Sequence, residues 1–237
     1  MAIASIETFH CQVDTVKTRL DVVKKNFCAR LRADMTDRYH HGDLPNALRA
    51  AAADLIAERG LGGFSLREVA RRAGVSHAAP AHHFGDTTGL LTSLAIQGFA
   101  YLGDSLVAAA EGIDDPVERL VAVGRAYVRV ATVHPGHCQV MFRTDVVDVD
   151  DPELQRVGRR AYSVLEDAVR AVADASNPDL DVIEAANFCW TMSQGLLELY
   201  PKIAIIGGVQ DHPTPPIEDL LERFTHLALD GLRHAET

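Results

Sequence analysis

Apolar residues recur at helical spacing along most of this 237-residue chain, and no stretch alternates as a half-buried strand would. From residue 44 onward, capping residues and Gly or Pro breakers divide this pattern into segments. The segments predict helices over residues 44–59, 66–72 and 77–83, then from 87 to beyond 106, and over 116–133, 137–143, 153–175, 182–200 and 216–233. The chain is therefore predicted to be all-α.

The stretch from Ser65 to Phe84, SLREVARRAGVSHAAPAHHF, predicts two short helices joined by a tight turn. Ser65 and Glu68 have the spacing of a capping box, which marks a helix start. Gly74 can take a positive φ at no steric cost, and Ser76 is a natural cap for the second helix. This order of elements is typical of a helix-turn-helix, whose second helix enters the DNA major groove.

Several residues in and beside this motif are suited to contact DNA. Small side chains let a helix approach base edges, while hydroxyl, imidazole and guanidinium groups bind bases or phosphates. A helix N-terminus also attracts phosphate. For the two arginines, a merely solvated charge explains the sequence equally well. The candidates are Ser65, Arg67, Arg71, Ser76, His77, Ala78, Ala81, His82, His83 and Thr87.

The net charge of −10 is unusual for a DNA-binding protein, but the charge is unevenly distributed. Residues 1–100 carry 12 Lys and Arg against 10 Asp and Glu, whereas residues 101–237 carry 11 against 23. This asymmetry is consistent with a small DNA-contacting head followed by an acidic body.

We expect three regions along the chain. Residues 1–38 form an N-terminal extension, predicted as a peripheral basic amphipathic helix, unless Met35 is the physiological start. Residues 42–102 form the DNA-binding domain, and residues 103–237 form a second, helical domain. The chain shows no signal-peptide pattern and no run of about 18 apolar residues, so we expect a cytoplasmic protein without a membrane partner.

The body carries bulky side chains that can line an effector pocket, because such pockets are mostly apolar with few polar groups. Aromatic residues at helical spacing are more often simply core, and that alternative stays open for each one. The candidates are Tyr127, Met141, Phe142, Tyr162, Phe188, Trp190 and Met192. The last two predicted helices carry enough apolar surface to pair with a second copy, which predicts a homodimer.

The sequence offers little for metal or enzyme chemistry. The four cysteines are scattered without a C-x-x-C pair, so buried small residues or free thiols are the better interpretation. For His82–His83 and for His134 with His137, packing or DNA contact is preferred over metal binding. With no nucleophile elbow and no carboxylate pair singled out by spacing, we expect no enzyme activity and no cofactor.

The motif residues resemble the N-terminal domain of TetR/AcrR-type transcriptional regulators. The resemblance covers about residues 42–102 and rests on FSLREVARRAGVS followed by HHFGDTTGLL at family spacing. It implies a homodimer that reads a palindromic operator in double-stranded DNA and is released by a small-molecule effector. It also implies that residues 103–237 are a helical ligand-binding and dimerisation domain. Within the body, NFCWTMSQGLLEL resembles the W-x-x-x-H-G motif of one subgroup, with Gln194 in place of His between Trp190 and Gly195.

Two departures from the family pattern concern phosphate anchors. The family usually has Tyr before its His-Phe pair, where this chain has Ala81 or His82, and commonly Lys where this chain has Thr87. Because phosphate contacts supply most sequence-independent affinity, we expect weaker or more salt-sensitive DNA binding. The sequence thus predicts a ligand-responsive regulator, acting as a repressor released by a small apolar effector. The alternative is a dimeric ligand-binding or protein-interaction module with weakened DNA affinity.

Overall fold

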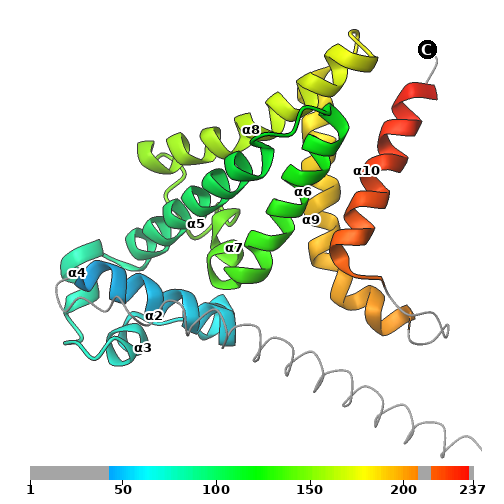
Figure 1. Cartoon of the computed structure of the whole chain (residues 1–237). Coiled ribbons are helices and arrows are strands. Elements are labelled where there is room, and N and C mark those ends of the chain that lie inside the picture. The colour runs from blue at the N-terminus through cyan, green and yellow to red at the C-terminus, as the bar shows by residue number, and fades with distance from the viewer. Residues whose placement is uncertain (1–42, 208–214, 235–237) are drawn as a thin grey trace, which may run out of the picture. The chain divides into compact units, whose positions relative to one another are not determined.

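The computed structural model describes residues 43–207 and 215–234, which form nine α-helices and no strand (Figure 1). The first three helices lie together at one end of this part of the chain. They are α2 (Leu44–Arg59), α3 (Leu66–Arg72) and α4 (Ala79–Phe84), with a 3₁₀ turn, η2 (Leu61–Gly63), after α2. The predicted all-α class is confirmed, whereas the helix predicted within residues 1–38 lies outside the described residues.

The remaining helices build the body. They are α5 (Thr87–Ala110), α6 (Pro116–Val133), α7 (Pro135–Met141), α8 (Pro152–Ser176), α9 (Val182–Gly207) and α10 (Ile217–His234). Short carboxylates start several of them, because an Asp side chain can accept from N–H groups that have no partner within the helix. The caps are Asp86 on α5, Asp115 on α6, Asp151 on α8 and Asp181 before α9.

Four predicted helix bounds, in three helices, are wrong. The second helix of the motif begins at Ala79 rather than His77, because Pro80 fits only the first turn, where its missing N–H costs nothing. Pro135 likewise opens α7, which ends at Met141 rather than Arg143. The ninth helix continues past Tyr200 to Gly207 with Pro201 inside it, so one proline was not enough to end a long, packed helix.

Helix α5 links two apolar cores. Its first half packs with α2 and α3 around Leu55, Val69 and Leu94, and its second half packs with α6, α8 and α9 around Leu102. A third, smaller core lies between α6, α9 and α10. By length and hydropathy α5 passes as a membrane-spanning helix, but half of its most apolar window is buried inside this protein. Such burial is typical of a core helix.

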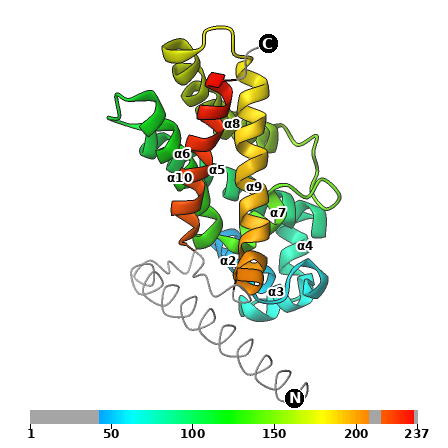
Figure 2. The same cartoon turned by 90° about the vertical axis from the view of Figure 1, so that its right-hand side faces the viewer.

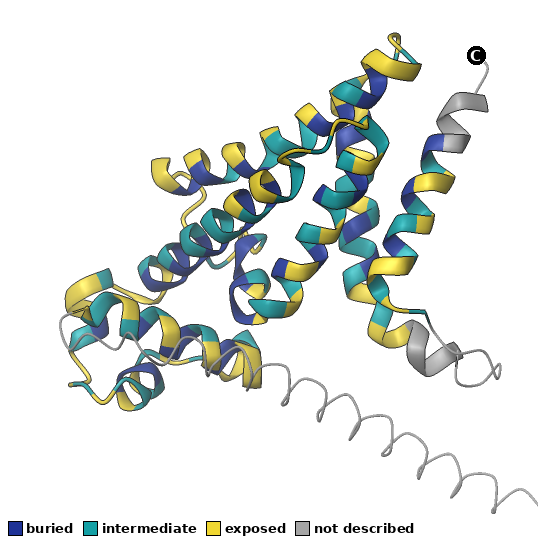
Figure 3. Ribbon diagram, viewed as in Figure 1, coloured by how far each residue is buried: buried dark blue, intermediate teal, exposed yellow. Residues whose placement is uncertain are grey.

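The short helix α7 is wedged between the first helices and the body. A Cβ atom added to Gly136 would lie 2.0 Å from the carbonyl oxygen of Ala53 on α2. On the other side, a Cβ atom added to Gly98 of α5 would lie 2.6 Å from the Met141 sulfur. The first approach is backbone to backbone and is possible only for glycine, so α7 touches α2 at backbone distance. At Gly98 it is the Met141 side chain of α7 that packs against the backbone of α5. Figure 3 shows buried positions concentrated on α5 and α7, while α4 is largely exposed.

Candidate DNA interface and effector cavity

The helix α3 begins with half of the predicted capping box. The Ser65 side chain accepts a hydrogen bond from the Glu68 N–H at 3.3 Å, as predicted. The Glu68 carboxylate does not return to Ser65. It forms two hydrogen bonds of 2.8 Å with Arg71 and one of 3.3 Å with Arg72. Arginine supplies a planar pair of donors that matches a carboxylate, so this charge pairing replaces the second half of the box.

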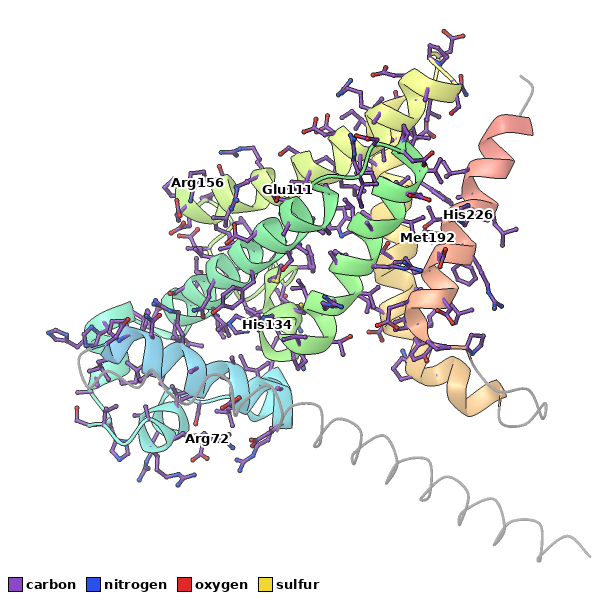
Figure 4. The ribbon with its side chains drawn as sticks, viewed as in Figure 1. Arg72, Glu111, His134, Arg156, Met192 and His226 are labelled. Atoms are coloured by element: carbon purple, nitrogen blue, oxygen red, sulfur yellow. The ribbon has the colours of Figure 1, made fainter. Side chains whose placement is uncertain are left out.

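This pairing limits what Arg71 offers to DNA. Hydrogen bonding from Arg71 lowers the pKa of Glu68 to about 2, and the same bonds raise the pKa of Arg71. Arg72, labelled in Figure 4, also binds Glu58 of α2 at 2.6 Å and so fastens α3 to α2. Arg67 is exposed. Unlike Arg71, the other arginine named as a DNA candidate, it is not bound to Glu68.

The turn and α4 present a small, open surface. Gly74 has a φ of 68°, in the region that favours glycine, as predicted. The capping role predicted for Ser76 is wrong, because Ala78 occupies the cap position and no side chain caps α4. Pro80 is fully buried and turns the opposite side of α4 outward. The exposed residues of this segment are Ser76, His77, Ala78, Ala81, His82 and His83.

The end of α4 is held by Arg49 of α2, which the sequence did not single out. Its guanidinium carbon lies 5.9 Å from the centre of the Phe84 ring, within range of a cation–π contact. It donates to Ser93 of α5 at 3.0 Å and to the side chain of Asn46. Its Nε atom is buried without a hydrogen-bond partner in the described part of the chain. One side chain thus joins α2, α4 and α5.

Close backbone contact fixes the start of α5 beside α4. A Cβ atom on Gly89 would lie 1.9 Å from the Phe84 carbonyl oxygen, so only glycine permits this approach. Asp86 accepts the Gly89 N–H at 2.9 Å and so caps α5. Thr87 is the exposed first residue of α5, next to the exposed end of α4.

A small cavity of about 20 Å³ lies among α5, α6, α7 and α9. Three of the seven predicted effector residues line it, namely Tyr127, Met141 and Phe142. The sequence interpretation missed the other lining residues, because no local pattern distinguishes them from ordinary core. They are Leu102, Val130, Ala131, Cys138, Gln194 and Leu197. The volume is close to that of a single water molecule, so an effector must enlarge it.

The other predicted effector residues do not line this cavity. Trp190 packs on Phe142 and on Tyr162, with ring centres 5.5 Å and 6.2 Å apart. Phe188 is 51% exposed, because it lies two residues from Trp190 and so on the opposite side of α9. Met192 packs into the third core, next to α10 (Figure 4). For Phe188 and Met192, the assignment to one pocket is not supported by their positions.

An aromatic cluster occupies the junction of α5 and α7. The Tyr101 ring stacks on His134 at 4.5 Å and meets His137 edge-on at 5.4 Å. His137 is hydrogen-bonded to Gln97 at 3.1 Å, and burial lowers its pKa to about 4. Both imidazoles are therefore packed and neutral near pH 7. Within the described residues, no three His, Cys, Asp or Glu side chains come together as metal ligands.

Two family models match this chain. Residues 48–94 match bacterial regulatory proteins of the tetR family, and residues 120–227 match the tetracyclin repressor-like C-terminal domain. Together they cover more than half of the chain, including the helix-turn-helix, most of α6 and all of α7 and α9, whereas most of α5 lies between the two matches. The chain belongs to the TetR family of bacterial regulatory proteins. The W-x-x-x-H-G subgroup remains a resemblance only.

Individual relatives in the TetR family are distant. The regulator BetI of Serratia proteamaculans is 27% identical over 116 residues, which are 46% of this chain and 59% of that protein. The matching region thus spans little more than half of this curated relative. A Rhodococcus protein of unknown function shares the fold with a TM-score of 0.67 and 29% identity, over 82% of this chain and 98% of that one. For the TetR family regulator PfmR of Thermus thermophilus the TM-score is 0.62 at 22% identity, over 78% and 98%, which supports the fold alone.

Proposed function

We propose that this protein is a ligand-responsive, DNA-binding transcriptional regulator that represses its targets as a dimer on a palindromic operator. The single observation that carries this is the exposed face of α4, whose small and imidazole side chains lie within a TetR-type helix-turn-helix. A helix of this kind can approach base edges closely in the major groove. Such a regulator acts in the cytoplasm, where its DNA lies.

The proposed DNA contacts divide into two groups. Ala78, Ala81 and His77 face the bases, because they lie on or at the start of the exposed side of α4. Phosphate contacts come from the flanking elements, where exposed polar groups and helix starts lie. These contacts are Ser65 and Arg67 at the start of α3, Ser76, His82 and His83, and Thr87 at the start of α5. Arg71 joins them only when it leaves Glu68.

The proposed effector is small and largely apolar, and it acts by enlarging the cavity. Cys138 and Met141 of α7 line the cavity, while Gly136 of the same helix touches α2 at backbone distance. Since packed interiors do not deform continuously, a ligand that displaces α7 and tilts α5 also moves the recognition helix. The two heads of a dimer would then no longer match the spacing of the operator half-sites.

The proposed dimer forms through α9 and α10, which pack together along one side of the protein (Figure 2). Four of the six large apolar side chains that the described chain exposes lie on these two helices: Ile183, Phe188, Leu199 and Leu227. Exposed apolar groups of this kind are buried when a second copy packs on them. Sedimentation of the wild type and of Phe188→Glu tests this, and a monomeric wild type would contradict it.

Titration of the purified protein with a labelled duplex from the intergenic DNA upstream of its own gene tests the function. We expect a dissociation constant below about micromolar at moderate salt. Ala81→Glu should weaken binding on the order of a hundredfold, because a carboxylate then faces the phosphates and bases. Gln155→Glu adds the same charge on the exposed face of α8 and should bind like the wild type. A wild type that binds no fragment in this range contradicts the proposal.

One observation favours the alternative, a ligand-binding or protein-interaction dimer with weakened DNA affinity. The chain lacks the usual Tyr and Lys anchors, and Arg71 is already paired with Glu68. In that case effector binding persists while no operator fragment binds, and the two titrations separate the two functions.

A further inference from the structure

The side-chain amide of Gln194, on α9, lies at the wall of the cavity without a hydrogen-bond partner among the described residues. The side chain is half-buried. The amide is not among the buried atoms without a partner, so water can reach it until a ligand displaces that water. A primary amide has two donor hydrogens and a carbonyl acceptor, and such groups are normally paired when they are withdrawn from bulk water. The Gln194 amide can therefore donate to and accept from a polar group of a ligand that enters the cavity and displaces water.

The rest of the cavity wall is uncharged. Its lining contains no Asp, Glu, Lys, Arg or His, and the two titratable groups present are Tyr127 and Cys138. Burial raises the pKa of the Cys138 thiol to about 12 and raises the pKa of Tyr127 as well, although the neighbouring Trp190 lowers the latter. Both groups stay protonated and neutral in the physiological range, so the wall offers no countercharge to an ion.

These two features select a ligand by its polarity. A charged group buried here would lose its hydration without gaining an ion pair, a loss that proteins rarely tolerate. A fully apolar ligand would leave the Gln194 amide unpaired, and sites built to hydrogen-bond a polar group reject analogues that lack it. A neutral molecule with one donor-and-acceptor group meets both conditions.

We propose that the effector is a neutral, mostly apolar molecule carrying one amide or hydroxyl group, and that Gln194 selects it by pairing with that group. This inference rests on the proposed function, in which the cavity is the effector site. Gln194 also occupies the position where the W-x-x-x-H-G motif has His. An imidazole can become a cation or a metal ligand there, whereas Gln194 stays neutral at every pH.

Four probes on one aromatic skeleton test this inference: phenylacetamide, phenylacetate, phenethylamine and ethylbenzene. Binding to the full chain is measured by calorimetry and by the rise in melting temperature, which follows from binding to the folded state. Phenylacetamide should bind at least about tenfold more tightly than either ion, since neither ion finds a countercharge. Ala131→Leu, which fills the cavity wall, should abolish binding of all four.

Substitutions at Gln194 separate a selective role from a structural one. Gln194→Leu should weaken phenylacetamide binding by roughly three- to tenfold and strengthen ethylbenzene binding, because the amide partner is lost. Gln194→Glu should invert the order in favour of phenethylamine, since a carboxylate then faces the ammonium. Gln155→Leu, an exposed glutamine on α8, serves as the matched control and should leave all four affinities unchanged.

Three results would overturn the inference: an ion that binds most tightly to the wild type, a Gln194→Leu variant with unaltered selectivity, or the failure of all four probes to bind at millimolar concentration. The operator titration on the same preparation is independent of these results. Loss of operator binding with intact amide selectivity removes the proposed regulator function but leaves the effector class standing. The reverse outcome removes only the effector class.

Discussion

The candidate DNA interface and the effector cavity are built in opposite ways. The interface is a surface made from consecutive residues, and charge pairs such as Arg72–Glu58 together with tight glycine contacts support it from behind. The cavity is an interior space enclosed by four helices, with no charged side chain in its wall. The difference teaches that the site that reads DNA is local in the sequence, whereas the site that controls it exists only after the helices pack.

The two regions meet at α7, and the largest effect is expected there. Gly136→Ala should lower the free energy of unfolding by about 3 kcal/mol, because its Cβ would overlap the Ala53 carbonyl and force α7 away from α2. Gly158→Ala on α8 is the matched control. With open space at its Cβ, it should raise stability by about 0.5–1 kcal/mol through helix propensity. Chemical denaturation measures the free energy of unfolding of both variants. Equal changes would show that α7 does not pack tightly against α2.

The second test uses pH to open the same junction. Burial, with the nearby His134 and Arg49, lowers the pKa of His137 from 6.5 to about 4. Below pH 6.5, His137 is protonated in the unfolded chain but stays neutral in the folded chain. The free energy of unfolding therefore falls as the pH drops from about 6.5 to about 4. At 1.36 kcal/mol per pKa unit, this linkage amounts to about 3 kcal/mol. His137→Gln should flatten that slope, whereas His226→Gln on the exposed face of α10 should leave it unchanged.

The third test concerns Arg49, which links α2 to the end of α4 and to Ser93 in the first half of α5. Arg49→Met keeps the length of the side chain but removes the donors to Ser93 and Asn46 and the cation over Phe84. We expect stability to fall by about 1 kcal/mol. Operator affinity should fall roughly fivefold, because α4 is then less firmly held. Unchanged operator affinity would show that Phe84 and Gly89 position the helix without Arg49.

The smallest effect is expected at the α3 charge pairs. Glu68→Gln should release Arg71 from its carboxylate and make it available to phosphate, whereas Arg72 stays bound to Glu58. Operator affinity at low salt should then rise about threefold, and the dependence of log affinity on log salt should steepen by about one phosphate contact. Glu166→Gln, which releases Arg170 on α8, is the control for added positive charge. An unaltered salt dependence would show that Arg71 does not reach the DNA.

Most of the fold was predictable because its signals are local. Helix periodicity, Asp caps and glycine turns predicted the bounds of α2, α6 and the all-α class correctly. Errors arose where a proline sits near a helix end, since Pro80, Pro135 and Pro201 permit more than one boundary and packing chooses among them. The half-formed capping box is a different case, because Arg71 and Arg72 lie three and four residues after Glu68 on the same helix. Residues at these spacings are neighbours on a helix surface, so the competition for Glu68 could have been predicted from the sequence.

The sequence by itself determined the helix-turn-helix and which of its residues can face DNA, because those properties follow from spacing along one or two helices. Only the tertiary structure decided that Arg72 reaches Glu58 of α2, that Arg49 holds Phe84, and that Gln194 and Cys138 share a cavity wall with Tyr127. The physical reason is that the spacing of apolar residues indicates which face of a helix is buried, but not which other helix packs against that face. The close approaches of Gly136 to the Ala53 carbonyl and of the Met141 side chain to Gly98 determine how the helices pack around the effector cavity.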